Sequence, residues 1–118
     1  MTALLAQIRP RPTDLMRAAG MQPDPWQRDA LLSDAPRVLF LTTRQAGKST
    51  TVGALAAFEA VFKPGSLTLL LSPSLRQSAE LFRKVLDFYR AVPGAPRPTS
   101  DSALRVELAN GSRVVSLP

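Results

Sequence analysis

The sequence contains no cysteine and no histidine. Without cysteine, the chain has neither a disulfide framework nor a thiolate metal site. Without histidine, it lacks the commonest general base and the commonest zinc ligand. Any chemistry that the chain performs must therefore use lysine, arginine, carboxylate, hydroxyl and amide groups.

Long apolar runs and acidic residues are also scarce. No apolar run reaches the ~18 residues that predict a membrane-spanning helix, and the apolar stretch at the N-terminus is too short for a secretory signal. Nine acidic residues face fifteen basic ones, for a net charge of +6. This balance favours a polyanionic partner, a nucleotide or a nucleic acid, without choosing between them. We expect a soluble, intracellular protein.

The most informative segment is residues 42–50, Thr-Thr-Arg-Gln-Ala-Gly-Lys-Ser-Thr. A β-prone apolar run at 38–41 precedes it, and an apolar helical pattern at 49–62 follows. Strand, tight loop, Gly-Lys-Ser and helix is the arrangement that binds a nucleoside triphosphate, because loop amides and the helix N-terminus attract phosphate. Gly47 lets the backbone come close to the phosphates, and Lys48 supplies a positive charge for the β/γ-phosphates. Ser49 offers its hydroxyl to Mg²⁺.

The loop departs from the strict phosphate-loop pattern at one position, because Thr42 stands where the first glycine is expected. The alternative interpretation is a polar loop between two core elements, with an incidental lysine. The flanking strand and helix patterns favour phosphate binding, since the mechanism requires both.

A second informative stretch precedes the loop. Asp24 followed by Pro25 predicts the start of a helix that carries Trp26 and Gln27. A glutamine amide both donates to and accepts from an adenine edge. The alternative is a solvated Gln27 beside a core tryptophan, and the phosphate loop downstream favours the first interpretation.

The other elements follow from periodicity and from turn residues. Arg76 and Gln77 fall at a strand-to-helix turn on the same sheet edge as the phosphate loop. We expect Glu80 and Lys84 to form an i,i+4 pair on a solvated helix face. The expected elements are a short helix within 1–9, a helix from 13 to a cap at Gly20, a buried strand at 67–71, a helix from 74 to 90, a loop at 92–102, and strands at 104–108 and 113–117 joined by a two-residue Asn110-Gly111 turn.

The carboxylate that a triphosphatase needs on a neighbouring strand is missing from the sequence pattern. The site normally reads as four apolar residues followed by Asp or Asp-Glu, and we find no such strand pattern among the nine acidic residues, of which Glu107 comes nearest. We therefore expect a chain that ends before the element carrying this acid.

Four of these motifs together resemble the large terminase subunits of tailed phages. They are Pro25-Trp26-Gln27, the Arg-Gln-x-Gly-Lys-Ser form of the loop at 44–49, the Ser-Pro-Ser-Leu-Arg-Gln-Ser run at 72–78, and the Asn-Gly-Ser-Arg turn at 110–113. They follow the family order over residues 12–118. The resemblance implies an α/β fold, an incomplete P-loop NTPase domain with a parallel sheet flanked by helices and a C-terminal β-hairpin. It implies a helical or linker segment at 1–24 and a partial ATPase domain at 25–118, without the Walker B strand and the nuclease domain.

The resemblance also implies roles for single residues, with ATP and Mg²⁺ as cofactors. Gln27 matches the adenine-contacting glutamine, Lys48 the catalytic phosphate lysine and Ser49 the hydroxyl on the Mg²⁺ side. Arg44 matches an arginine that acts on the γ-phosphate in cis, although a trans arginine from a neighbouring subunit is the competing view. The remaining loop residues implied to bind the nucleotide are Thr43, Gln45, Ala46, Gly47 and Thr50.

For the full-length protein, the resemblance implies ATP-driven translocation of double-stranded DNA into procapsids in the cytoplasm of a bacterial host. Implied partners are the portal protein and the small terminase subunit, with a homo-oligomeric ring and no membrane. The chain itself is expected to bind ATP weakly without turnover, and to aggregate through exposed strand edges. The alternatives are a helicase-like motor ATPase outside phage packaging and a non-enzymatic DNA-binding module.

Overall fold

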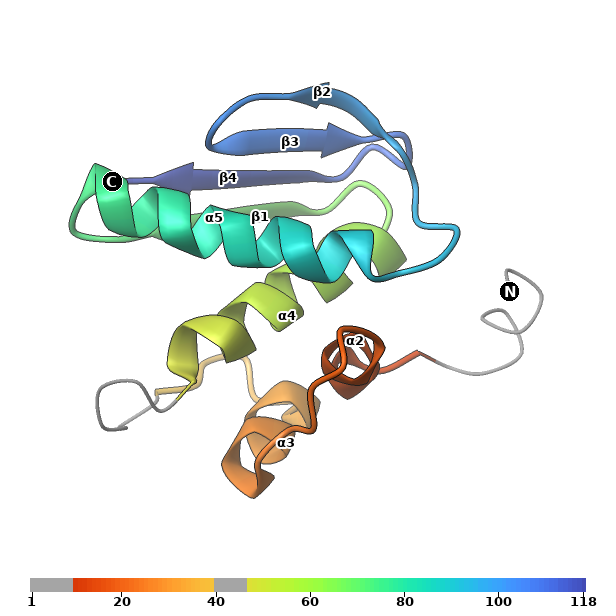
Figure 1. The fold of residues 1–118 in the computed structure, drawn as a ribbon, viewed down its shortest axis with the longest axis vertical. Helices are drawn as coiled ribbons and strands as arrows, with labels where there is room; N and C mark the ends of the chain where they lie inside the picture. Colours follow the sequence, from red (N-terminus) through yellow and green to blue (C-terminus); the bar gives the residue numbers. More distant parts are fainter. Residues whose placement is uncertain (1–9, 40–46) are drawn as a thin grey trace.

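The computed structural model describes residues 10–39 and 47–118. These residues form helices packed against one face of a four-stranded sheet (Figure 1). None of the described helices has the length and apolar character that crossing a membrane requires. The elements are α2 (Pro12–Ala18), α3 (Pro25–Leu32), α4 (Lys48–Phe62), β1 (Leu67–Leu71), α5 (Leu75–Arg90), β2 (Pro98–Asp101), β3 (Arg105–Leu108) and β4 (Arg113–Leu117).

The sheet is mixed, with strand order β1-β4-β3-β2. Strands β1 and β4 are parallel, whereas β4 with β3 and β3 with β2 are antiparallel. The α/β class is confirmed, and the description of the sheet as parallel is corrected. The physical reason is the hairpin, since a short turn returns the chain beside itself and forces antiparallel pairing.

The two faces of the sheet differ in burial. Val106 and Val114 point to the face covered by helices and are at most 4% exposed, and Ser116 Oγ on the same face donates to the carbonyl of Ser78 on α5. On the opposite face of β1, Leu69 and Leu71 are 55% and 73% exposed. The prediction of a buried strand is therefore wrong for this face, because the described helices cover only the other one.

Small residues set the spacing between the helices. Ala54, Ala57 and Ala60 on α4 are at most 3% exposed, and a Cβ built at Gly53 would lie 3.1 Å from the Cβ of Lys84 on α5. The short side chains let α4 and α5 approach closely, with Phe82 of α5 filling the core. Helix α2 packs against α4 and α5 and adds Leu15 and Met16 to the same core.

Helix boundaries agree closely with the sequence expectations. Pro25 is the first residue of α3, and Gly20 with its φ of +83° follows α2. The amide of Met21 donates to the carbonyl of Met16, which completes a Schellman motif around Gly20. Ser74 caps α5 by accepting from the amide of Gln77.

The C-terminal hairpin is confirmed, but its turn is longer than the two residues expected. The Leu108 amide donates to the Ser112 carbonyl across three intervening residues, and Gly111 has a φ of +86°. Asn110 Nδ2 donates to the carbonyls of Ala60 and Val61 at the end of α4. This tertiary contact accompanies the longer turn, and no local sequence pattern predicts it.

Three further expectations concern residues 98–101, 38–41 and 1–9. Residues 98–101 form strand β2 inside the stretch expected to be a loop, and all four of its residues are exposed. Proline is tolerated there because β2 is an edge strand. The strand expected at 38–41 is not formed by Val38 and Leu39, which are 49% and 92% exposed, and its other half lies outside the described residues. The helix expected within 1–9 also lies outside them.

Candidate functional site

The predicted phosphate loop is described only from its last glycine onward. Thr43, Arg44, Gln45 and Ala46 lie outside the described residues, as does Thr42. Gly47 is the N-cap residue of α4, with φ +91°, and Lys48 to Thr50 form the first turn of that helix. The helix begins where the motif requires, so its free amides and positive dipole end lie at Gly-Lys-Ser.

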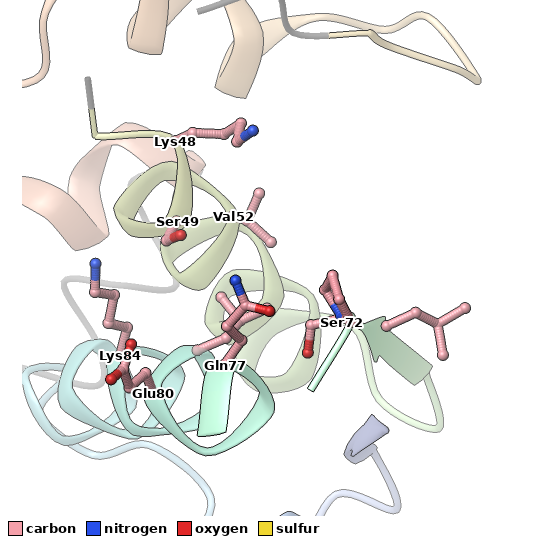
Figure 2. Close-up of a pocket in the computed structure, with 10 residues that line it drawn as sticks. Lys48, Ser49, Val52, Ser72, Gln77, Glu80 and Lys84 are labelled. Atoms are coloured by element: carbon pink, nitrogen blue, oxygen red, sulfur yellow. The ribbon is translucent and has the colours of Figure 1, made fainter. Parts of the chain in front are cut away.

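A cleft of about 430 Å³ opens between the start of α4, the end of β1 and the first half of α5 (Figure 2). Lys48 and Ser49 of α4 line it together with Gln77 of α5. The parallel strand β1 ends at this cleft, which is the usual position of a ligand site in an α/β sheet. Its remaining lining residues are Val52, Leu71, Ser72, Pro73, Glu80, Leu81 and Lys84.

Arg76 and Gln77, which were predicted together at the strand-to-helix turn, differ in whether they line the cleft. Gln77 lines the cleft, and Figure 2 shows its amide turned toward α4. Arg76 does not line it, because its side chain is 90% exposed and its Nε lies 3.4 Å from Oε1 of Glu80. The expected pairing of Glu80 with Lys84 is therefore replaced by an Arg76–Glu80 pair.

Lys84 is a cleft residue that the sequence argument missed. It lines the cleft, and its amine points from α5 toward the first turn of α4 (Figure 2). Charge periodicity placed Lys84 on a solvated helix face. The signal that would have found it is Gly53, since a glycine within an alanine-rich helix marks a close approach by another element.

The cleft combines groups that suit a polyphosphate. Two ammonium groups, Lys48 and Lys84, carry positive charge, Ser49 adds a hydroxyl, and Gln77 adds an amide. Glu80 is the one carboxylate among the lining residues. Among the described residues, no group of three or more acidic, histidine or cysteine side chains is arranged to hold a metal ion. The donor set therefore favours phosphate oxygens over a metal held by protein carboxylates alone.

Gln27 lies apart from the cleft lining and is only 5% exposed. Its Nε2 donates to the Gly47 carbonyl at 3.2 Å and to Thr51 Oγ1 at 3.0 Å. Its Oε1 accepts from the Asp24 amide at 2.9 Å. Both ends of the amide thus bind the protein itself, at the junction between α3 and α4.

Comparisons with protein-family models and with curated proteins give no match. Among solved structures, the ATPase domain of the Thermus phage P74-26 large terminase matches with a TM-score of 0.75 and 25% identity, over 91% of this chain. An arginine-to-alanine mutant of the same domain matches with the same TM-score and 24% identity, over 90% of this chain. The chain has the fold of a phage large terminase ATPase domain.

This likeness confirms the resemblance that the sequence motifs indicated. The chain spans 50% of the length of each solved terminase chain. The match is consistent with a P-loop-like fold.

Proposed function

We propose that this chain is the ATP-binding part of a phage large terminase, the motor that drives double-stranded DNA into procapsids by ATP hydrolysis. The cleft at the start of α4, lined by Lys48, Ser49 and Lys84, carries the proposal. The terminase fold supports it independently, because it associates this architecture with an ATPase domain.

Different residues of the cleft would contact different parts of a triphosphate. Lys48 provides a charge for the β/γ-phosphates, and the amides at the start of α4 provide donors. Ser49 is the described residue that fits Mg²⁺, through its hydroxyl oxygen, and the bound cation would offset phosphate charge. Lys84 adds a second cation from α5. Arg44 remains the proposed γ-phosphate arginine, and Thr43, Gln45, Ala46 and Thr50 the remaining loop residues.

In the whole protein we further propose the partners that the terminase fold suggests, namely the portal protein, the small terminase subunit and neighbouring copies in a homo-oligomeric ring. The net charge of +6 suits a DNA partner. Glu80 is the one carboxylate among the residues that line the cleft, and it lies on α5 and not at the end of a strand, where a triphosphatase carries its Mg²⁺ carboxylate. We therefore expect this chain to bind ATP without turning it over, and Mg²⁺-dependent phosphate release by the purified chain would contradict that expectation.

Titration calorimetry of the purified chain with MgATP tests the binding proposal. Lys48→Ala should weaken ATP binding about tenfold or more, because it removes a charge-assisted phosphate contact. Lys63→Ala is the matched control, since Lys63 lies beyond the C-terminal end of α4 and pairs with Glu59 at 2.8 Å. Equal ATP affinity for the wild-type chain and Lys48→Ala would overturn the proposal.

A further inference from the structure

We propose that Gln27 is a positioning residue for the phosphate site, which acts by fixing the first turn of α4 and not by reading the base. The inference rests on the proposed function and assigns the amide a different role from the adenine contact that the resemblance implies. Its basis is a closed hydrogen-bond network among Gln27, Gly47 and Thr51.

The network uses the full donor capacity of the amide. A glutamine amide has two N–H donors, and here they bind the Gly47 carbonyl and the Thr51 hydroxyl. The carbonyl of the same amide accepts from the backbone of Asp24, at the N-cap of α3. To donate to a base, Gln27 would have to give up one of its two donor bonds, at a position where it is 5% exposed. Unpaired buried polar groups are costly, so the described arrangement is strongly favoured.

The network converges on the residue directly before Lys48. The Gly47 carbonyl accepts from the Thr51 amide at 3.0 Å and from the Thr51 hydroxyl at 2.8 Å, in addition to Gln27. Thr51 is 1% exposed, so water cannot readily replace its partners. The orientation of the Gly47 peptide sets the direction of the first helical turn, which carries Lys48 and Ser49 into the cleft. Gln27 thereby connects α3 to the geometry of the phosphate site.

Gly47 is matched to this network in shape as well as in backbone conformation. A Cβ built at Gly47 would lie 2.8 Å from Nε2 of Gln27, closer than a real Cβ contact allows. Its φ of +91° also lies in the region that favours glycine. The glycine of the Gly-Lys-Ser motif therefore makes room for the Gln27 amide.

Comparing three ligands separates positioning from base reading. We would measure the affinity of the whole chain for ATP, GTP and inorganic tripolyphosphate, each with Mg²⁺. If Gln27 positions the phosphate site, Gln27→Ala weakens all three by the same factor, about tenfold. If it reads adenine, the loss is confined to ATP. A loss confined to ATP, or unchanged tripolyphosphate affinity, would overturn the inference.

The hydroxyl of Thr51 provides a second test with a matched pair of variants. Thr51→Val keeps the shape and removes the hydroxyl, so it should weaken all three ligands as Gln27→Ala does. Thr51→Ser keeps the hydroxyl and should restore wild-type affinity. Because the two residues act through one network, the double variant Gln27→Ala/Thr51→Val should lose little more than either single variant. Additive losses would contradict a shared network.

Controls separate this inference from folding effects and from the proposed function. Asp29→Ala, an exposed change on the same helix, should leave all three affinities unchanged. Each affinity is measured at a temperature well below the thermal unfolding midpoint of the ligand-free variant. If Gln27→Ala does not fold, the comparison of Thr51→Val with Thr51→Ser tests the inference instead. If Lys48→Ala loses tripolyphosphate but Gln27→Ala and Thr51→Val do not, only this inference fails. If the wild-type chain binds none of the three, the proposed function and the inference fail together.

Discussion

The α3–α4 junction and the free edge of β1 border the same helix, yet one is closed and the other is open. At the junction, Gln27 and Thr51 are buried and hydrogen-bonded to each other. Along β1, an apolar hollow of about 260 Å³ opens between Leu55 of α4 and Leu70 of β1, while Leu69 on the outer face is 55% exposed. Among the described residues, hydrogen bonds therefore close the α3–α4 junction, whereas a hollow remains beside β1.

The difference is whether a hydrogen-bonding partner lies among the described residues. Gln27 and Gly47 are separated by 20 residues, and both belong to the described elements. In the described part of the chain, β1 pairs only with β4, so its other edge presents unpaired backbone groups. The solved terminase chains are twice as long as the segment that this chain matches.

The largest expected effect contrasts the two faces of the sheet. Phe82→Ala should lower the free energy of unfolding by about 3–5 kcal/mol, because it leaves a cavity in the core where Phe82 is 2% exposed. Leu69→Ala should cost less than about 1 kcal/mol, since half of that side chain already faces water. Urea unfolding of both variants measures the difference. Equal losses would mean that the outer face is covered in solution.

The next effect concerns the closed junction. Gly47→Ala should cost about 2–4 kcal/mol, because it combines a strained positive φ with a clash against Gln27. Gly65→Ala is the matched control: its φ is +77°, but nothing lies within 4 Å of the added Cβ. It should cost only the conformational strain, about 1 kcal/mol. Thermal unfolding compares the two, and a Gly47→Ala loss no greater than that of Gly65→Ala would show that the junction is loose.

A smaller effect is expected at the open edge. The wild-type chain should self-associate through β1 and its exposed leucines, because unpaired apolar edges template strand pairing. Leu69→Lys should weaken this association about tenfold, since charge on an edge strand opposes pairing. Sedimentation velocity over a range of concentrations measures it. A monomeric wild-type chain with one cooperative thermal transition would contradict the prediction.

The smallest expected effect concerns Lys84, a cleft residue on α5. Lys84→Ala should weaken triphosphate binding about two- to fivefold, because it removes one partly solvated charge, and the loss should shrink as salt is raised. Arg76→Ala is the control, since its side chain is 90% exposed and lies outside the cleft lining. Titration calorimetry at two ionic strengths measures the triphosphate affinity of both variants. Equal losses for Lys84→Ala and Arg76→Ala would indicate only a general effect of net charge.

The local signals were sufficient for most element boundaries. Residues at helix ends act within one helical turn, so nearby residues in the sequence are enough to predict their effect. Examples are Pro25 at the start of α3, Gly20 after α2 and Ser74 before α5. The motif likewise placed the start of α4 at Gly-Lys-Ser, and the combination of motifs indicated the terminase fold. Fold class and the location of the candidate site therefore follow from the sequence alone.

Only the tertiary structure decided the partners of individual side chains. The burial of Gln27 against Gly47, the turn of Lys84 toward α4 and the anchoring of Asn110 on α4 each depend on contacts between distant segments. The exposure of Leu69 likewise depends on which face of the sheet the helices cover. Periodicity tells which residues share a face, but only packing decides what lies opposite it. For this reason the sequence indicated a phosphate site, and the structure showed which residues contact the start of α4.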